Sequence, residues 1–357
     1  MLPMLRLTEI KLPLDHSADD LRAAVLARLG IADADLHALH IFRRAPDARR
    51  RNAIRLTYTV DVEVADEAAV PNPRPTPDVT YRPVTQARGS FQRPVVIGAG
   101  PCGLFAALIL AEMGFRPLVL ERGKVVRQRT KDTWDLWRRG VLHPESNVQF
   151  GEGGAGTFSD GKLHSQITDR LHQGRKVLTE FVKAGAPDDI LTEAHPHIGT
   201  FRLVTMVMSI RETIEALGGE YRFQTRVEDF AIDTASDGTR QIAGLHLSDG
   251  SFLPARHVVL AVGHSARDTF YKLYEAGVHA EAKPFAIGVR IEHPQSWIDK
   301  ARYGPNAGNS ILGPAAYSLS HRTSNGRTVY SFCMCPGGRV VAATSEEGRV
   351  VTNGMSQ

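Results

Sequence analysis

A glycine motif at residues 98–103 constrains this chain more than any other feature. Three apolar residues, 95–97, lead straight into Gly98-x-Gly100-x-x-Gly103, and an apolar helical run follows. Gly98 permits a tight turn, Gly100 lets the backbone approach a pyrophosphate, and Gly103 lets the helix pack closely on the strand. The start of that helix offers N–H groups and a partial positive charge to phosphates. The order predicts a strand, a tight turn and a helix that together bind phosphate.

A second apolar strand follows this helix and completes the unit. Leu118, Val119 and Leu120 precede Glu121, whose carboxylate can accept hydrogen bonds from ribose hydroxyls. A GxGxxG motif alone is a weak signal, but a strand before it, a helix after it and an acid about 20 residues on make it strong. The stretch therefore predicts a βαβ unit that binds an ADP-containing cofactor, without saying which one.

A second glycine-rich segment spans residues 147–163. Five glycines fall within the eleven positions 151–161, so a stable helix or strand interior is excluded there. Such backbone is used where the chain lies against something flat or phosphorylated. Phe150 and Phe158 flank the glycines and charges are sparse. We therefore favour a loop held against the cofactor ring over a flexible surface loop.

The rest of the chain divides at a proline-rich stretch. Five prolines between positions 71 and 83 predict an extended linker with little chance of helix. Before it, a capping pattern at Ser17–Asp20 opens a helix that Gly30 closes, and strands are expected near Leu36–Phe42 and Ile54–Val64. We expect a small N-terminal α+β domain (1–65), the linker (66–94), a cofactor-binding domain (95–278) and the start of a second, substrate domain (279–357).

Strand patterns resume after residue 219. Glu220–Arg226, Val227–Asp233 and Gln241–Leu247 are bounded by turn residues and predict a β-meander. The run 256–263 is apolar at its centre, as in a buried parallel strand, and ends in Ala261-Val-Gly263. The glycine at its end lets the chain pass the ADP moiety closely, which predicts a second cofactor contact.

Bulk composition narrows the function classes. Lys and Arg number 43 against 39 Asp and Glu, a balance that argues against a nucleic-acid or membrane partner. The arginine cluster at residues 43–51 is local, and we interpret it as a solvated hairpin loop. No apolar run approaches the ~20 residues of a membrane span, and the N-terminus lacks a signal-peptide core. Three cysteines argue for a reducing compartment, and the prediction is cytoplasmic.

Several motifs together resemble a bacterial family of FAD-dependent dehydrogenases with the glutathione-reductase type of FAD fold. They are GAGPCGLFAA (98–107), LERG (120–123), PESNVQFGEGGAGTFSDGKL (144–163), LAVGHSARD (260–268), FAIGVRIEHP (285–294) and SFCMCPGG (331–338). The resemblance covers nearly the whole chain. It implies an α/β, Rossmann-like FAD/NAD(P)-binding fold with a β-meander, preceded by a small α+β domain.

The resemblance also implies a site and an activity. The FAD-binding residues would be Gly98, Ala99, Gly100, Pro101, Cys102, Gly103, Glu121, Arg122, Arg129, Gly153, Gly154, Gly156, Thr157, Val227, Ala261 and Gly263. Within this set Val227 would touch the adenine through its backbone, and Cys102 stands where the family usually has Ala or Ser, a thiol we interpret as packing. The activity would be that of a flavoprotein oxidoreductase, a dehydrogenase that passes hydride or electrons through FAD to or from a small-molecule substrate, with NADH or NADPH as a possible electron donor.

Two other function classes stay open. One is a flavoprotein whose FAD is structural or assists a non-redox step such as RNA modification, and the other is a plain NAD-binding regulatory module. The meander and the 147–163 segment argue against the second. Flavoproteins of this fold end in a late strand closing with Gly-Asp, and no Gly-Asp follows residue 263. We therefore expect the chain to be a C-terminally truncated fragment.

Candidates for catalysis are few, and no metal site is predicted. Cys333 and Cys335 form a Cys-x-Cys pair whose thiols would point to opposite sides of an extended strand, so a disulfide between them would be strained. Two interpretations stay open: one thiol lies near the flavin, or both thiols are buried in a strand before a glycine turn. Arg290, Glu292 and His293 alternate on an expected strand, where they would line a substrate pocket or form a solvated face. Catalytic residues otherwise stay unknown.

Overall fold

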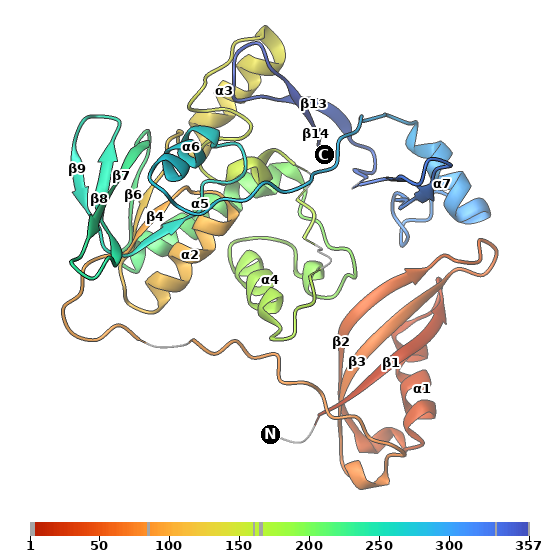
Figure 1. The fold of residues 1–357 in the computed structure, drawn as a ribbon. Helices are drawn as coiled ribbons and strands as arrows, with labels where there is room; N and C mark the ends of the chain where they lie inside the picture. The colour runs from red at the N-terminus through yellow and green to blue at the C-terminus, as the bar shows by residue number, and fades with distance from the viewer. Residues whose placement is uncertain (1–3, 84–85, 160, 164–166, 333, 356–357) are drawn as a thin grey trace.

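The computed structural model describes residues 4–83, 86–159, 161–163, 167–332 and 334–355 (Figure 1). The chain is a mixed α/β protein, as the sequence predicts. The N-terminal part contains β1 (Met4–Pro13), α1 (Ala18–Leu29), β2 (Leu36–Asp47) and β3 (Arg55–Val64). The three strands form an antiparallel sheet in the order β1-β3-β2, and the apolar face of α1 packs on it.

Local chemistry explains why α1 begins and ends where it does. The Ser17 hydroxyl accepts from the Asp20 N–H while the Asp20 carboxylate accepts from the Ser17 N–H, which is the predicted capping box. Gly30 closes the helix at φ 71°, a left-handed conformation that favours glycine. β2 continues to Asp47, beyond the predicted end at Phe42. The prediction that Arg43 and Arg44 lie in a hairpin loop is therefore wrong, because ladder pairing with β3 carries the strand through both residues.

The proline-rich stretch is tied to this small sheet at its start. The Arg6 N–H donates to the Arg74 carbonyl and the Thr76 N–H to the Met4 carbonyl, each at 2.8 Å. A short 3₁₀ turn, η2 (Glu67–Ala69), precedes these bonds. Figure 1 shows residues 86–94 running in extended form to β4. The linker thus leaves from the edge of β1, whose backbone groups it partly satisfies.

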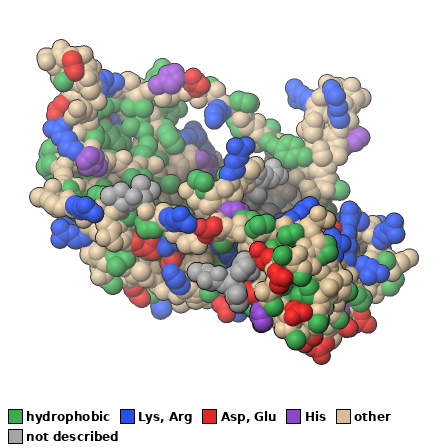
Figure 2. All heavy atoms as spheres, turned by 90° about the horizontal axis from the view of Figure 1, so that it is seen from below, with side chains coloured by type: hydrophobic (Ala, Val, Ile, Leu, Met, Phe, Trp, Pro, Cys, Tyr) green, Lys and Arg blue, Asp and Glu red, His purple; other side chains and the backbone are tan. Residues whose placement is uncertain are grey.

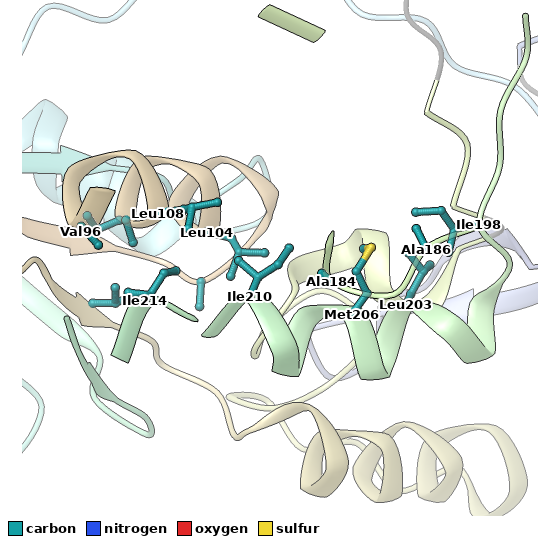
Figure 3. Close-up of a cluster of buried hydrophobic side chains, with 14 of the residues drawn as sticks. Val96, Leu104, Leu108, Ala184, Ala186, Ile198, Leu203, Met206, Ile210 and Ile214 are labelled. Atoms are coloured by element: carbon teal, nitrogen blue, oxygen red, sulfur yellow. The ribbon is translucent and has the colours of Figure 1, made fainter. Parts of the chain in front are cut away.

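A four-stranded parallel sheet organises the middle of the chain. Its order is β10-β4-β5-β6, formed by β10 (Val258–Leu260), β4 (Val95–Ile97), β5 (Leu118–Leu120) and β6 (Glu220–Arg222). On one face lie α2 (Pro101–Glu112) and α5 (Thr200–Ala216), joined by an apolar core. Figure 3 shows Leu203, Met206, Ile210 and Ile214 following one side of α5, with Leu104 and Leu108 of α2 nearby. This is the spacing expected of an amphipathic helix.

A second, antiparallel sheet covers the other face. β7 (Val227–Thr234), β8 (Arg240–Leu247) and β9 (Phe252–Pro254) pair in that order. Ile97 and Leu120 of the parallel sheet share a core with Val227 and Leu245 of this sheet, and all four are buried. The carboxyl ends of β4 and β5 are thus covered on both sides by apolar packing, which leaves the end of the sheet as the place where a ligand can enter.

Two strand predictions need correction. The run 256–263 gives only the three residues of β10, and Leu260 is 40% exposed rather than buried. β10 lies at an edge of the sheet, so it has a neighbour on one side only. The predicted strand Glu220–Arg226 is limited to β6, since the chain leaves the sheet after Arg222 and crosses to β7.

The remaining elements surround this core. They are α3 (Val126–Arg139), η3 (Gly154–Phe158), α4 (Gln173–Lys183), η4 (Asp188–Leu191), α6 (Arg267–Glu275), α7 (Gln295–Tyr303), η5 (Gly304–Asn306) and the strands β11 (Ser320–Arg322), β12 (Thr328–Tyr330), β13 (Arg339–Ala343) and β14 (Val351–Met355). The β13–β14 hairpin lies beside α3, where the Trp137 indole N–H donates to the Ala342 carbonyl at 2.8 Å. None of the described helices is both long and apolar enough to cross a membrane.

The C-terminal part also corrects a prediction. Residues 278–294 are extended and exposed but belong to no strand, so Arg290, Glu292 and His293 do not lie in a sheet among the described residues. The N-terminal part contacts η5, which follows α7. There the Asn306 amide donates to the Arg51 carbonyl at 3.0 Å. In the face that Figure 2 presents, basic and acidic side chains are interspersed, and no single basic surface forms there.

Candidate functional site

A cavity of about 460 Å³ opens at the carboxyl ends of β4, β5 and β10, beside the start of α2. Eleven of the sixteen predicted cofactor-binding residues line it: Gly98, Gly100, Pro101, Cys102, Glu121, Arg122, Gly154, Gly156, Val227, Ala261 and Gly263. The two glycine-rich segments, the β7 start and the β10 exit are therefore brought to one place. Segments separated by more than a hundred residues in sequence share this cavity wall.

The first glycine turn has no room for side chains at two positions. A Cβ on Gly98 (φ 100°) would lie 2.4 Å from the Ala261 carbonyl oxygen, and one on Gly103 would lie 1.8 Å from the Gly98 carbonyl oxygen. Gly103 thus sits behind the cavity and holds α2 against β4. Gly100 is the N-cap of α2 and offers no side-chain cap, so the helix begins with backbone facing the cavity. That arrangement suits an anionic group.

Glu121 joins three parts of the site. Its Oε2 accepts from the Ala99 N–H at 2.7 Å, and its Oε1 accepts from the N–H groups of Gly123 at 2.8 Å and Gly151 at 3.0 Å. The residue is only 4% exposed, yet it lines the cavity. An ionised carboxylate has about four acceptor positions. Three are occupied by backbone, and one on Oε2 remains to accept from a hydroxyl in the cavity.

The second glycine segment touches the first through backbone alone. The Gly153 N–H donates to the Ala99 carbonyl at 2.8 Å, and a Cβ on Gly154 (φ 60°) would lie 2.8 Å from the Gly100 Cα. Gly154 and Gly156 reach the cavity, while Gly153 and the buried Thr157 lie behind it. Contact this close requires glycine at position 154, whereas a Cβ on Gly100 would meet the Gly154 Cα at an ordinary 3.7 Å. The two segments thus form one continuous wall.

The structure corrects the prediction for Arg129. Its side chain is fully buried and does not reach the cavity. The guanidinium donates to the carbonyls of Asn147 (2.7 Å), Val148 (2.8 Å), Gly151 (3.3 Å) and Glu152 (2.7 Å). Burial lowers the pKa of Arg129 to about 10, against the opposing effect of Glu121 and Glu152. Arg129 therefore supports the second glycine segment from behind instead of binding phosphate.

Arg122 forms a flat wall of the cavity. Its guanidinium lies 4.1 Å from the centre of the Phe150 ring and donates to both oxygens of Glu145, at 2.8 and 3.0 Å. It also donates to Asp268 at 3.1 Å. Burial disfavours the charged form, but the bonds to Glu145 and Asp268 outweigh it and raise the pKa of Arg122. A planar cation fixed in this way can stack against a ring or pair with an anion.

Other predicted residues take places that the sequence left open. Cys102 is exposed at the start of α2 and lines the cavity, so the interpretation of its thiol as packing is wrong. Within the 260–268 motif, His264 also lines the cavity, whereas Arg267 pairs with Glu346 of the C-terminal hairpin. Ala99 lies behind the wall, fully buried.

Some cavity residues were missed. Thr269 and Phe270 of α6 line the cavity but belong to no motif that sequence reasoning would notice. Gln149 was within the glycine-rich segment, and its side chain contacts the C-terminal hairpin. Its Nε2 donates to the Ala343 carbonyl and its Oε1 accepts from the Ser345 hydroxyl, both at 2.9 Å. The hairpin thus helps to hold the wall of the cavity.

The one cysteine candidate that the structure describes lies away from this cavity. Cys333 is outside the described residues. Cys335 is half-buried and is not among the residues that line the cavity. The Lys162 ammonium donates to its sulfur at 3.8 Å. No group of three or more His, Cys, Asp or Glu that could hold a metal ion occurs in the described parts of the chain.

Two protein families and a protein of another organism are similar to this chain. The family described as "FAD-dependent protein, C-terminal domain-like" matches residues 284–357, and a domain of unknown function, DUF8436, matches residues 4–63. A protein of Clostridium beijerinckii, named only as an uncharacterized protein, is 43% identical over 360 residues, which cover 99% of this chain and 66% of that protein. The chain thus spans about two thirds of the length of this relative.

Several solved structures of low identity are similar to about half of this chain. Thermovibrio ammonificans THI4 is 19% identical with a TM-score of 0.35, over 52% of this chain and 62% of that one. The 3-ketosteroid-delta4-(5alpha)-dehydrogenase of Rhodococcus jostii is 17% identical with a TM-score of 0.33, over 49% and 46%. Glycine oxidase of Bacillus cereus is 14% identical with a TM-score of 0.33, over 52% and 59%.

Proposed function

We propose that this chain binds FAD and belongs to a flavin-dependent oxidoreductase. The observation that carries the proposal is the meeting of two glycine-rich segments in direct backbone contact at the start of α2, with a buried carboxylate between them. Such a wall has no side chains in the way of a pyrophosphate and offers N–H groups to its charge. The family description that names FAD-dependent proteins supports the same cofactor.

The residues present fit the cofactor. The pyrophosphate would lie over the backbone of Gly98 and Gly100, and a ribose hydroxyl would donate to the remaining acceptor position of Glu121. The adenine would lie between Val227 and the flat guanidinium of Arg122, and Gly154 would face the ribityl side. FAD supplies two-electron transfer when bound. The protein orients it and keeps water from it.

The partners we propose are small molecules. NADH or NADPH would deliver hydride to the flavin. An unidentified small molecule would accept the electrons from the flavin, or would serve as the electron donor in place of the nicotinamide. Gln149, which lines the cavity, is held by the C-terminal hairpin, so that hairpin borders one side of the proposed site. The activity of a complete protein as long as the Clostridium relative is part of the same proposal, since this chain spans about two thirds of that length.

The test is flavin binding and reduction. Purified protein reconstituted with FAD is expected to show a bound-flavin absorption spectrum and to bleach anaerobically with NADH or NADPH. Gly100→Ala should keep the fold, because its Cβ would meet only the Gly154 Cα at 3.7 Å, but should weaken FAD binding at least tenfold. Gly288→Ala, with nothing within 4 Å of its Cβ, is the matched control.

The outcomes separate the alternatives. Bound flavin that neither nicotinamide reduces, although dithionite does, would favour a structural or non-redox role for FAD. Absence of bound flavin in wild type after FAD is added, with the fold intact by circular dichroism, would refute the proposal. Equal FAD affinity in Gly100→Ala and Gly288→Ala would show that the glycine turn does not face the pyrophosphate.

A further inference from the structure

A second cavity, of about 270 Å³, lies beside the proposed FAD cavity. Its wall includes side chains from four segments: Arg122 and Lys124 after β5, Glu145 and Ser146 after α3, Arg226 before β7 and Ser248 after β8. Arg122 and Arg226 also line the larger cavity, so the two cavities share a wall. Pockets for whole drug-sized ligands measure about 300–1,000 Å³. The second cavity is therefore of a size for a small molecule or for one group of a larger molecule.

The hydrogen-bond acceptors of this second cavity are largely used within the protein. Among the described residues that line it, Glu145 is the one with a carboxylate. Its oxygens accept from Arg122 at 2.8 and 3.0 Å and from Arg226 at 2.7 Å. Glu145 thus holds the two guanidinium groups beside each other, and little of its accepting capacity remains. A ligand that fits here has to supply acceptors of its own.

The cations of the wall keep donors for such a ligand. Asp132 takes one of the three N–H donors of Lys124, at 3.0 Å. Glu228 and Glu145 together take three of the five N–H donors of Arg226. The acids that pair with these cations from outside the lining residues are Asp132, Glu228 and Asp268. Lys124 and Arg226 therefore contribute N–H groups that no acid of the described residues occupies.

Two serines add neutral donors. Ser146 is only 3% exposed, and its Oγ has no hydrogen-bond partner among the described residues. A buried hydroxyl without a partner costs free energy, which a ligand atom that accepts its proton would recover. The Ser248 hydroxyl accepts from the Arg226 N–H at 3.3 Å and keeps its own proton to donate. Cations and hydroxyls that all donate match the needs of an oxyanion.

We propose that the second cavity binds a phosphate group, either the free ion or the phosphate of a small phosphomonoester. The phosphate oxygens would accept from Lys124 and Arg226 and from the hydroxyls of Ser146 and Ser248. The step is binding alone, so no bond forms or breaks. The site adjoins the proposed FAD cavity but needs no FAD, and the proposal does not depend on the proposed function.

The experiment is isothermal titration calorimetry at constant ionic strength. The probes are inorganic phosphate and glycerol 3-phosphate, each titrated into the protein with and without saturating FAD. We expect saturable binding to a single site, and the tighter of the two probes tells the free ion from the ester as the source of the group. Ser146→Ala should weaken the binding of both probes about tenfold or more, because it removes a hydrogen bond to a charged group.

The controls separate this site from general effects. Ser236→Ala is the matched control, because Ser236 is exposed in the turn between β7 and β8, at the opposite end of that hairpin from Arg226 and Ser248. It should leave phosphate binding unchanged. Arg226→Gln should weaken binding further than Ser146→Ala, and Arg226→Lys should recover part of the loss. Gly100→Ala, which alters the FAD cavity, should leave phosphate binding in place.

Three results would overturn the proposal. One is the absence of saturable phosphate binding in wild type, and another is equal affinity in Ser146→Ala and Ser236→Ala with both folded by circular dichroism. The third is loss of phosphate binding on addition of FAD or in Gly100→Ala, which would mean that the phosphate occupies the FAD cavity. If the protein binds no FAD, the titrations without it still decide the matter. If Arg226→Gln fails to fold, Ser146→Ala decides it, since its Oγ has no partner to lose.

Discussion

Replacing Arg129 by methionine tests whether the second glycine segment depends on one buried guanidinium. The substitution introduces an apolar side chain of similar length but removes the guanidinium donors to the carbonyls of Asn147, Val148 and Glu152. Hydrogen bonds to a charged group contribute about 1.5–3 kcal/mol each, and three of these bonds are 2.8 Å or shorter. The cost of burying the guanidinium offsets part of that sum. We expect Arg129→Met to lose about 3–5 kcal/mol of unfolding free energy.

The assay is urea unfolding followed by tryptophan fluorescence. Trp134 and Trp137 lie in α3 with Arg129 and report on the same part of the fold. Arg127→Met is the matched control, because Arg127 is exposed on the same helix and its recorded partner is the Met208 sulfur. We expect that control to change stability by no more than about 0.5 kcal/mol.

The expected order of stability is wild type, Arg129→Lys, then Arg129→Met. Lysine restores a charge but cannot reach four carbonyls in a fork, so it should recover only part of the loss. A loss below about 1 kcal/mol in Arg129→Met would refute the reasoning, since it would mean that the freed carbonyls find water or other donors at little cost. A loss as large in Arg127→Met would point instead to a general weakness of α3.

Two further predictions concern charge and exposure. Hydrogen bonds and charge from Lys183 and Lys176 outweigh burial and lower the pKa of Glu180 below its ordinary 4.5. The stabilisation from the ionised Glu180 is therefore present above pH 4.5 and is lost as the pH falls through the pKa of Glu180 in the folded protein. In urea unfolding from pH 7 to pH 3, the difference in unfolding free energy between wild type and Glu180→Gln should shrink below pH 4.5. The side chains of Ile287 and Val289 are 91% and 95% exposed. Threonine at either position should change the unfolding free energy by no more than about 0.5 kcal/mol and should reduce light scattering at high protein concentration. A larger loss of stability would contradict the exposure of these side chains.

The sequence predicted those parts of the fold whose causes are local. The capping box at Ser17 and the left-handed Gly30 set the first and last residues of α1 through contacts with residues close by in the sequence. The glycine turn at 98–103 needs its glycines because a Cβ at Gly98 or Gly103 would collide with nearby backbone. In each case the determining contacts lie in the same segment or in the adjoining strand.

What the sequence did not predict depends on distant partners. The residues next to Arg129 in the sequence are those of an exposed basic helix. Arg129 is buried and supports the second glycine segment only because it donates to carbonyls 18 to 23 residues further along the chain. The exposure of Leu260 follows from the edge place of β10, and sheet order is set by crossovers rather than by the strand's own residues. Thr269 and Phe270 reach the cavity only because α6 packs beside β7. Nothing local distinguishes such residues.

Glu121 connects these two kinds of determinant. Its place at the end of β5 follows from the βαβ pattern, but its three backbone donors come from the first glycine turn, from its own loop and from the second glycine segment. The carboxylate is therefore fixed before any ligand arrives, and a cofactor hydroxyl has only to meet its one remaining acceptor position. Arg129 holds Gly151 in place from behind, so the acid that we propose to bind the ribose and the arginine behind the cavity wall act on the same loop. Loosening either contact should weaken cofactor binding through the same movement of residues 147–152.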